Sequence, residues 1–316
     1  MHKGYCVMQK KRVFIDGRAG TTGLRIFERL QNREDVELIL LSEEMRKDEN
    51  ARRDALNSSD FSFLCLPDDA ARQAVSLVTN QNTVIIDAST AHRTADGWAY
   101  GLPELGEKYR ARVAGFNRIA VPGCHASGFI ALVQPLVSAG IIPADALLSA
   151  YCVTGYSGGG KKMIADYECH KTELMESPGM YGLTQEHKHL KEMRYVSGIE
   201  NFPVFCPVVA DIYSGMHMSV PLFRSQINGT ANDIKEIYKN LYTGRIVRYC
   251  ESIDDNNFIY TLKNSGKDSM LVSVTGNEER ILLTAVYDNL GKGASGAAIE
   301  CFNIRSGCDE ETGLIL

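Results

Sequence analysis

Cys124 is the residue of this chain whose surroundings are best suited to covalent chemistry. It follows Pro122-Gly123 and precedes small residues and then an apolar run, a pattern that predicts a turn opening into a helix. The first turn of a helix has free backbone N–H groups and a partial positive charge. Both favour the thiolate, which is the nucleophilic form of cysteine. Cys124 is therefore a candidate nucleophile for attack on a carbonyl carbon.

The other cysteines fit structural roles better. The sequence has 9 cysteines, an odd number at scattered positions, which argues against a disulfide framework and for a reduced intracellular protein. No two of them have C-x-x-C spacing, so neither a metal cluster nor a redox dithiol is predicted. Cys65 and Cys152 have the apolar neighbours typical of strand interiors, whereas Cys124 lies among Pro, Gly and His.

His187 and His189 are the histidines most suited to acid–base chemistry, which imidazole performs near neutral pH. Glu192 follows His189 by three residues, so its carboxylate would orient that imidazole if a helix begins there. We therefore favour His189 as the acid–base group, with Glu192 as its carboxylate partner. His-x-His is also a zinc-ligand spacing, but the sequence offers no evident third ligand, and we predict no metal site.

A glycine-rich turn near the start of the chain predicts a dinucleotide site. Residues 13–17 are typical of a short strand and residues 24–30 have the apolar spacing of an amphipathic helix. Glycines between them let the backbone approach a pyrophosphate, whose charge the helix N-terminus favours. The alternative is an ordinary tight turn. The predicted cofactor-binding residues are Gly17, Arg18, Ala19, Gly20, Thr21, Thr22 and Gly23.

Alternating strands and helices are expected to position these groups. Strands are predicted at 36–41, 61–66 and 83–87 with a helix at 70–78, a rhythm that indicates a doubly wound parallel sheet of Rossmann type. Ligands of such sheets bind at the carboxyl ends of the strands.

A second domain is expected from the remaining pattern. Strands at 205–210, 214–222, 270–274 and 280–287, with few helices, favour an α+β catalytic domain with a mostly antiparallel sheet. We assign residues 1–123 and 289–316 to the dinucleotide-binding domain. Residues 124–288 are expected to form the catalytic, substrate and oligomerisation domain.

The residues after the second predicted strand favour NADP(H) over NAD. An acidic side chain there would bind a ribose 2′-hydroxyl and repel a 2′-phosphate. Ser42 instead follows the strand and could accommodate a phosphate. A basic cluster beyond it could neutralise one, or could be a solvated loop of mixed charge; it comprises Arg46, Lys47, Arg52 and Arg53.

Composition excludes several classes of protein. The 316 residues suggest roughly two domains, and a formal net charge of -5 gives no indication of nucleic-acid binding. The longest apolar region, residues 129–143, is interrupted by Gln134 and Pro135, so no transmembrane helix is predicted. The N-terminal residues lack the apolar core of a signal peptide. We expect a soluble cytoplasmic protein whose residues 1–10 form a disordered or variable extension.

Six motifs in this order resemble those of the short type of N-acetyl-γ-glutamyl-phosphate reductase, in the aspartate-semialdehyde dehydrogenase-like superfamily. The resemblance covers the chain from Val13 onward. The motifs are residues 87–93 (DASTAHR), 100–105 (YGLPEL), 121–128 (VPGCHASG), 157–160 (SGGG), 187–192 (HKHLKE) and 288–298 (DNLGKGASGAA).

The resemblance implies NADPH-dependent reduction of N-acetyl-L-glutamyl 5-phosphate to the 5-semialdehyde through a cysteine thioester, in arginine biosynthesis. Cys124 matches the family nucleophile, and one of the paired histidines matches the acid–base residue. Segments near the nicotinamide are matched by Ser157, Gly158, Asn289 and Gly293. Candidate substrate contacts are Ser89, Arg93 and His187. The resemblance also implies a homo-oligomer, a dimer or a tetramer.

The sequence departs from the family pattern at two positions. Val121 stands where longer members commonly have Asn, and Glu300 stands where many relatives have Gln. An aspartate-semialdehyde dehydrogenase would share the architecture and chemistry, but that family places its nucleophile in an Asn-Cys context. A nucleotide-sensing protein that has lost catalysis is the other alternative, against which Cys124, His189 and the glycine turn argue together.

Overall fold

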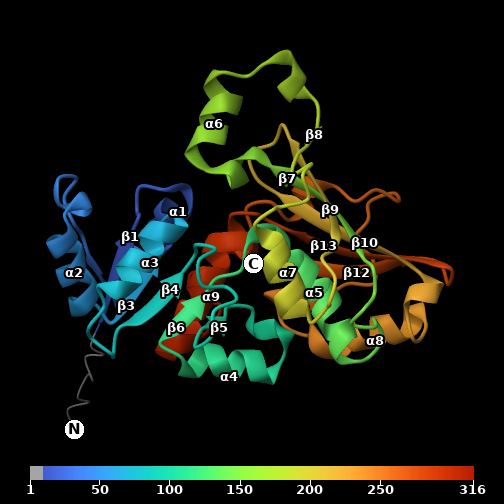
Figure 1. The fold of residues 1–316 in the computed structure, drawn as a ribbon, viewed down its shortest axis with the longest axis horizontal. Coiled ribbons are helices and arrows are strands. Elements are labelled where there is room, and N and C mark those ends of the chain that lie inside the picture. The colour runs from blue at the N-terminus through green and yellow to red at the C-terminus, as the bar shows by residue number, and fades with distance from the viewer. Residues whose placement is uncertain (1–9) are drawn as a thin grey trace, which may run out of the picture.

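A computed structural model describes residues 10–316 and contains two β-sheets flanked by helices (Figure 1). Apart from Lys10, the predicted N-terminal extension lies outside the described residues. Among residues 10–316, no helix is both long and apolar enough to cross a membrane.

The first sheet is parallel and six-stranded, in the order β2-β1-β3-β4-β6-β5. Its strands are β1 (Lys11–Asp16), β2 (Val36–Ile39), β3 (Phe61–Leu64), β4 (Val84–Asp87), β5 (Ala99–Tyr100) and β6 (Arg118–Ala120). The helices of this half are α1 (Thr21–Leu30), α2 (Glu49–Ser58), α3 (Asp68–Ser76) and α4 (Glu107–Gly115).

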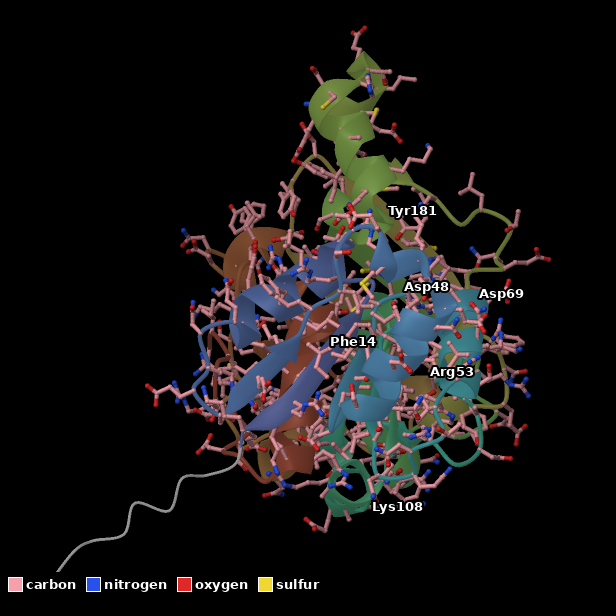
Figure 2. The ribbon with its side chains drawn as sticks, turned by 90° about the vertical axis from the view of Figure 1, so that its left-hand side faces the viewer. Phe14, Asp48, Arg53, Asp69, Lys108 and Tyr181 are labelled. Atoms are coloured by element: carbon pink, nitrogen blue, oxygen red, sulfur yellow. The ribbon has the colours of Figure 1, made fainter. Side chains whose placement is uncertain are left out.

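Both faces of this sheet are covered, which confirms the doubly wound prediction. Alternate residues of a strand point to opposite faces. Val13 and Ile15 of β1 pack in a core with α1 and α4, whereas Phe14 packs with residues of α2 and α3. Figure 2 shows Phe14 among the strands, with Arg53 of α2 and Asp69 of α3 at the outside.

The second sheet is mixed and seven-stranded, in the order β11-β12-β13-β10-β7-β9-β8. The pairs β12–β13, β13–β10, β10–β7 and β9–β8 are antiparallel, whereas β11–β12 and β7–β9 are parallel. The strands are β7 (Ser149–Gly155), β8 (Gly179–Met180), β9 (Val204–Ala210), β10 (Met216–Phe223), β11 (Val247–Tyr249), β12 (Met270–Gly276) and β13 (Arg280–Tyr287).

Helices α5 (Cys124–Ser138), α7 (His189–Ser197) and α8 (Ala231–Leu241) share one hydrophobic core with this second sheet. Helix α6 (Gly160–Cys169) and the segment that leads to β8 project from the body (Figure 1). After β13 the chain packs against the first sheet again. A π-helical turn (Gly291–Ser295) continues into α9 (Gly296–Ser306), and Ala297, Ile299 and Phe302 of this helix lie in the core of the first sheet.

Candidate active site

Cys124 is the first residue of α5, at the turn-to-helix junction that the sequence predicts. Gly123 is the N-cap of this helix and has no capping side chain, so the first-turn N–H groups are available to a ligand. The helix start is fixed from β13, because the Tyr287 hydroxyl donates a hydrogen bond to the Cys124 carbonyl at 2.6 Å. The neighbouring Gly128 N–H donates to the same hydroxyl oxygen at 3.2 Å.

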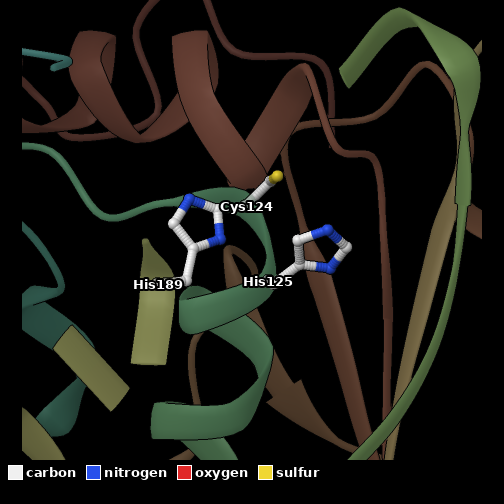
Figure 3. A group of neighbouring side chains, drawn as sticks. All are labelled: Cys124, His125 and His189. Carbon is white, nitrogen blue, oxygen red and sulfur yellow. The ribbon is translucent and has the colours of Figure 1, made fainter. Parts of the chain in front are cut away.

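The two predicted histidines lie beside the cysteine. His189 is the first residue of α7, and its backbone N–H donates to Nδ1 of His187 at 3.2 Å. Sγ of Cys124 and a ring nitrogen each of His125 and His189 lie within 4.8 Å of one another (Figure 3). Two helix N-termini therefore bring the Cys124 thiol together with the His189 imidazole, although the two residues are 65 positions apart in the chain.

Glu192 occupies a different place from the one expected for it. Its carboxylate accepts hydrogen bonds from Tyr100 Oη at 2.7 Å, Gly123 N at 2.8 Å and Arg93 Nη1 at 3.0 Å. His189 Nδ1 is buried and has no hydrogen-bond partner among residues 10–316. The expectation that Glu192 orients the His189 imidazole is therefore wrong in this structure. Position i+3 on a helix allows the contact, but the carboxylate turns toward Arg93 and the N-cap of α5.

The pKa of the Cys124 thiol is raised, contrary to the expectation of a stabilised thiolate. Burial is the largest cause, because it disfavours the charged form. The Arg93 guanidinium, the His125 backbone N–H and the Lys188 ammonium act in the opposite direction and are outweighed. The helix N-terminus supplies the predicted N–H group, but the sequence alone did not indicate how far neighbouring elements would desolvate the thiol.

The imidazoles beside Cys124 are held in their neutral form. Burial, followed by the charge of Arg93, lowers the pKa of His189 well below its ordinary value. Burial also lowers the pKa of His187 to about 4 and that of His125 to about 3. A neutral imidazole can accept a proton, so the thiol and its neighbours form an acid and a base at neutral pH.

A cavity of about 520 Å³ lies between residues of the first-sheet half and residues of the second-sheet half, and Cys124, His187 and His189 line it. Gly20, Thr21 and Thr22 of the glycine-rich turn line one part of it. Further lining residues predicted as nicotinamide contacts are Ser157, Gly158, Asn289 and Gly293. Asn289 donates to Ser157 Oγ at 3.0 Å, and a Cβ built on Gly293 would lie 3.0 Å from Cys124 Cβ.

The glycine-rich turn fits a dinucleotide pyrophosphate. Gly17 has φ +85°, and a Cβ built there would lie 2.2 Å from the Cys65 carbonyl oxygen, so a side chain is excluded. Gly20 caps α1 without a side-chain hydrogen bond, which leaves the first N–H groups of this helix free for an anion. Gly23 is buried in α1 and does not line the cavity.

A second cavity of about 360 Å³ continues from Gly17, Arg18 and Ala19 toward the end of β2. Arg46 and Lys47 of the predicted basic cluster line it, together with Glu43. Arg52 does not, because its guanidinium forms a buried ion pair with Asp16 at 2.8 Å. Arg53 pairs with Glu49 at 2.9 Å, and Ser42 Oγ donates to Glu44 at 2.7 Å. Arg46 pairs with Glu43 at 2.5 Å, so Lys47 is the member of the expected cluster that lines this cavity and forms no ion pair with a described residue.

Two of the three predicted substrate contacts line the larger cavity, and the third does not. Arg93 and His187 line the larger cavity, whereas Ser89 is buried against Asp87, which accepts hydrogen bonds from its N–H and its hydroxyl. Ser89 belongs to the motif at residues 87–93, but its donors are used by the buried Asp87 carboxylate at the end of β4, which indicates a structural role.

His125 and Tyr181 are site residues that the sequence reasoning missed. His125 Nε2 and the Tyr181 hydroxyl lie 2.6 Å apart, His125 Nδ1 lies 3.2 Å from Cys152 Sγ, and both residues line the cavity. Tyr181 lies at the base of the projecting α6 segment (Figure 2). The position of His125 directly after Cys124 was a usable signal, but no sequence pattern indicated Tyr181.

Comparisons with known proteins cover both halves of the chain. Residues 12–112 match the family model "Semialdehyde dehydrogenase, NAD binding domain", and residues 124–289 match "Semialdehyde dehydrogenase, dimerisation domain". In solved structures, the fold is similar to aspartate semialdehyde dehydrogenase II from Vibrio cholerae, complexed with ASA, with TM-score 0.73 at 18% identity over 95% of this chain and 99% of that one. The Candida albicans enzyme with NADP gives TM-score 0.64 at 14% identity, covering 94% and 99% of the two chains.

Curated relatives have higher sequence identity to this chain than these solved structures have. The chain is 42% identical to N-acetyl-gamma-glutamyl-phosphate reductase 2 of a Nostoc species, covering 97% of this chain and all (100%) of the relative. It is 44% identical to the N-acetyl-gamma-glutamyl-phosphate reductase of a Chelativorans species, covering 92% and 96%. The chain therefore belongs to the N-acetyl-gamma-glutamyl-phosphate reductase family of oxidoreductases.

Proposed function

We propose that this enzyme reduces N-acetyl-L-glutamyl 5-phosphate to N-acetyl-L-glutamate 5-semialdehyde with NADPH, as a step of arginine biosynthesis. The observation that carries the proposal is the convergence of Cys124 Sγ and a His189 ring nitrogen, within 4.8 Å, in a cavity that the cofactor loops share. The substrate is proposed from the names of the relatives, and the cavity next to the thiol has room for a small molecule.

The first half of the reaction forms a thioester. The Cys124 thiol gives its proton to neutral His189, and the sulfur attacks the acyl carbon. A C–S bond forms, the C–O bond to phosphate breaks, and phosphate leaves. N–H groups in the first turn of α5 are in place to stabilise the oxyanion, an interaction typically worth about 2.7–4 kcal/mol for each donor.

The second half releases the aldehyde. NADPH, when bound, would supply the hydride that reduces the thioester carbon. The resulting thiohemiacetal oxyanion collapses, the C–S bond breaks, and the sulfur takes back the proton held by His189. The cofactor would be held by the glycine-rich turn and by Ser157, Gly158, Asn289 and Gly293. Lys47 in the second cavity favours the 2′-phosphorylated cofactor.

The enzyme is proposed to act in the cytoplasm as a homo-oligomer, a dimer or a tetramer. The match of residues 124–289 to a dimerisation-domain model supports an assembly built by this part of the chain. Size-exclusion chromatography with light scattering tests this point, and a monomer at micromolar concentration would overturn it.

The reverse reaction tests the substrate. Phosphate-dependent reduction of NADP⁺ is expected with N-acetyl-glutamate semialdehyde and not with aspartate semialdehyde. Cys124→Ser is expected to abolish it, with a loss on the order of 10³-fold or more because the nucleophile is removed. Turnover with aspartate semialdehyde alone would assign the chain to the sister activity.

The paired histidines give a matched test of the acid–base assignment. His189→Asn is expected to lower kcat by about 10²- to 10⁴-fold, the usual contribution of a general acid–base group, with little change in KM for NADP⁺. His187→Asn serves as the control and should lower kcat much less. A larger loss in kcat for His187→Asn would reverse the assignment within the pair.

A further inference from the structure

The larger cavity carries positive charge and no negative charge. Arg93, Lys161 and Lys188 line it, and no Asp or Glu among the described residues does. The whole chain has a formal net charge of -5, so this local excess of cations is not a property of the surface in general. A wall of this kind suits an anionic ligand.

Arg93 is largely committed to the protein itself. Its Nε donates to the Val121 carbonyl at 2.9 Å, Nη1 to Glu192 at 3.0 Å and Nη2 to the Ala88 carbonyl at 3.0 Å. Its positive charge is balanced by the buried Glu192 carboxylate. Arg93 therefore fixes the wall of the cavity, and Lys161 and Lys188 are the lining cations that form no ion pair with a residue from 10 to 316.

Lys188 lies between His187 and His189, at the N-cap position of α7. Its side chain is exposed and forms no hydrogen bond or ion pair with any residue from 10 to 316. Its charge reaches the reacting groups: it adds to the lowered pKa of the His187 and His189 imidazoles and partly opposes the rise that burial causes in the pKa of the Cys124 thiol. Lys161, at the start of α6, follows the Ser157–Gly160 segment that the cofactor is expected to contact.

We propose that Lys188 binds the phosphoryl group of the acyl phosphate and neutralises it as it leaves. The inference rests on the proposed function. The phosphoryl oxygen is bonded to the carbon that Cys124 attacks, so the group must lie beside the thiol. Lys188 neighbours His189 there and forms no hydrogen bond or ion pair with a residue from 10 to 316, although its charge also acts on the Asp68 carboxylate. Negative charge grows on the phosphate as the C–O bond breaks, and an ammonium ion stabilises this charge.

Inorganic phosphate alone provides the test. Phosphate is expected to slow alkylation of Cys124 by iodoacetamide in the NADP⁺-loaded enzyme at constant ionic strength, with labelling at Cys124 followed by peptide mass spectrometry. Lys188→Met should raise the phosphate concentration needed for half-protection by about tenfold or more, as loss of a charged hydrogen bond would. Lys191→Met is the matched control, because Lys191 is exposed on the same helix and does not line the cavity.

The same variants separate binding from other effects in turnover. In the oxidative direction, Lys188→Met should raise KM for phosphate by about tenfold while KM for the semialdehyde stays within twofold, and Lys188→Arg should restore much of the loss. Unchanged phosphate protection in Lys188→Met, or a loss in Lys161→Met instead, overturns the proposal. If the wild-type protein oxidises no semialdehyde, but phosphate still protects its Cys124 and Lys188→Met loses this protection, the phosphate site is upheld and the proposed function is overturned.

Discussion

Desolvation governs the protonation of the reacting side chains. The N-terminal position of Cys124 on α5 favours a thiolate, yet burial outweighs it and keeps the thiol protonated in the free protein. The same burial keeps His189 neutral. Because the acid and the base are both uncharged before substrate binds, the proton transfer between them can accompany attack on the acyl carbon rather than precede it.

Alkylation of Cys124 therefore has an expected pH profile. Since its pKa is raised, the rate with iodoacetamide should increase about tenfold for each pH unit between pH 7 and 9, without a plateau. The exposed Cys169 is an internal reference, and it should be labelled faster than Cys124 at pH 7. Peptide mass spectrometry at timed quenches measures both. A plateau for Cys124 below pH 8 would show a preformed thiolate.

The N-termini of α5 and α7 are joined by a buried network rather than by the histidine–carboxylate pair expected from sequence. Glu192, 2% exposed, accepts hydrogen bonds from the N-cap residue of α5 and from Arg93 and Tyr100, which lie in the first-sheet half of the chain. Burial and the Glu192 charge together raise the pKa of Tyr100, so its hydroxyl stays a donor. These contacts fix the relative positions of the two helix starts that carry Cys124 and His189.

Gly123→Ala tests how tightly this junction is packed. A Cβ built at Gly123 would lie 2.4 Å from both Arg93 Nη1 and His189 Nε2, so one of these groups must shift. A displacement of this size next to reacting atoms is expected to lower kcat by about 10²-fold. Gly115→Ala, at the end of α4 with no atom within 4 Å of the built Cβ, should leave kcat unchanged. Equal activity of the two variants in steady-state assays would contradict this packing argument.

On the scale of the whole molecule, buried charges hold the C-terminal segment against the first half of the chain, and a further buried ion pair joins the two halves. Lys292, fully buried in the π-helical turn, contacts the carboxylates of Glu104 and Glu300. Arg29 of α1 pairs with Asp268, next to the second sheet, at 2.6 Å. Burial and the neighbouring Glu104 raise the pKa of Glu300 well above its ordinary value, because one lysine cannot neutralise two buried carboxylates.

Glu300→Gln should therefore change the pH dependence of stability. A carboxyl whose folded pKa is raised contributes stability that is present below the unfolded pKa of about 4.3 and is lost as pH rises toward the folded value. Glutamine does not titrate, so the free energy of unfolding of Glu300→Gln relative to wild type should rise between pH 5 and 8, by up to about 1.4 kcal/mol per unit. Urea unfolding at four pH values measures it. Exposed Glu278→Gln is the control, and a pH-independent difference for Glu300→Gln would refute the argument.

Local pattern was enough to predict most elements. The strand–glycine–helix signal at residues 13–30, the alternation through 87 and the helix after Cys124 all have counterparts in the structure, with ends shifted by a few residues. These features depend on periodicity and on glycine and proline, which act within a few neighbours. The predicted division at residues 123 and 289, and the roles of the individual site residues, remain predictions.

The sequence by itself determined the fold class, the family and the order of the motifs that supply a thiol, two imidazoles and a glycine-rich turn. Only the tertiary structure decided which partners these groups have. Local spacing favours Glu192 as the partner of His189, but Glu192 binds Arg93. Arg52 is a candidate phosphate contact by sequence, but it binds Asp16, and the pKa of Cys124, expected to be lowered by the helix N-terminus, is raised by burial. The physical reason is common to all three: pairing and desolvation of a charged group depend on side chains from distant parts of the chain, which a local pattern does not contain.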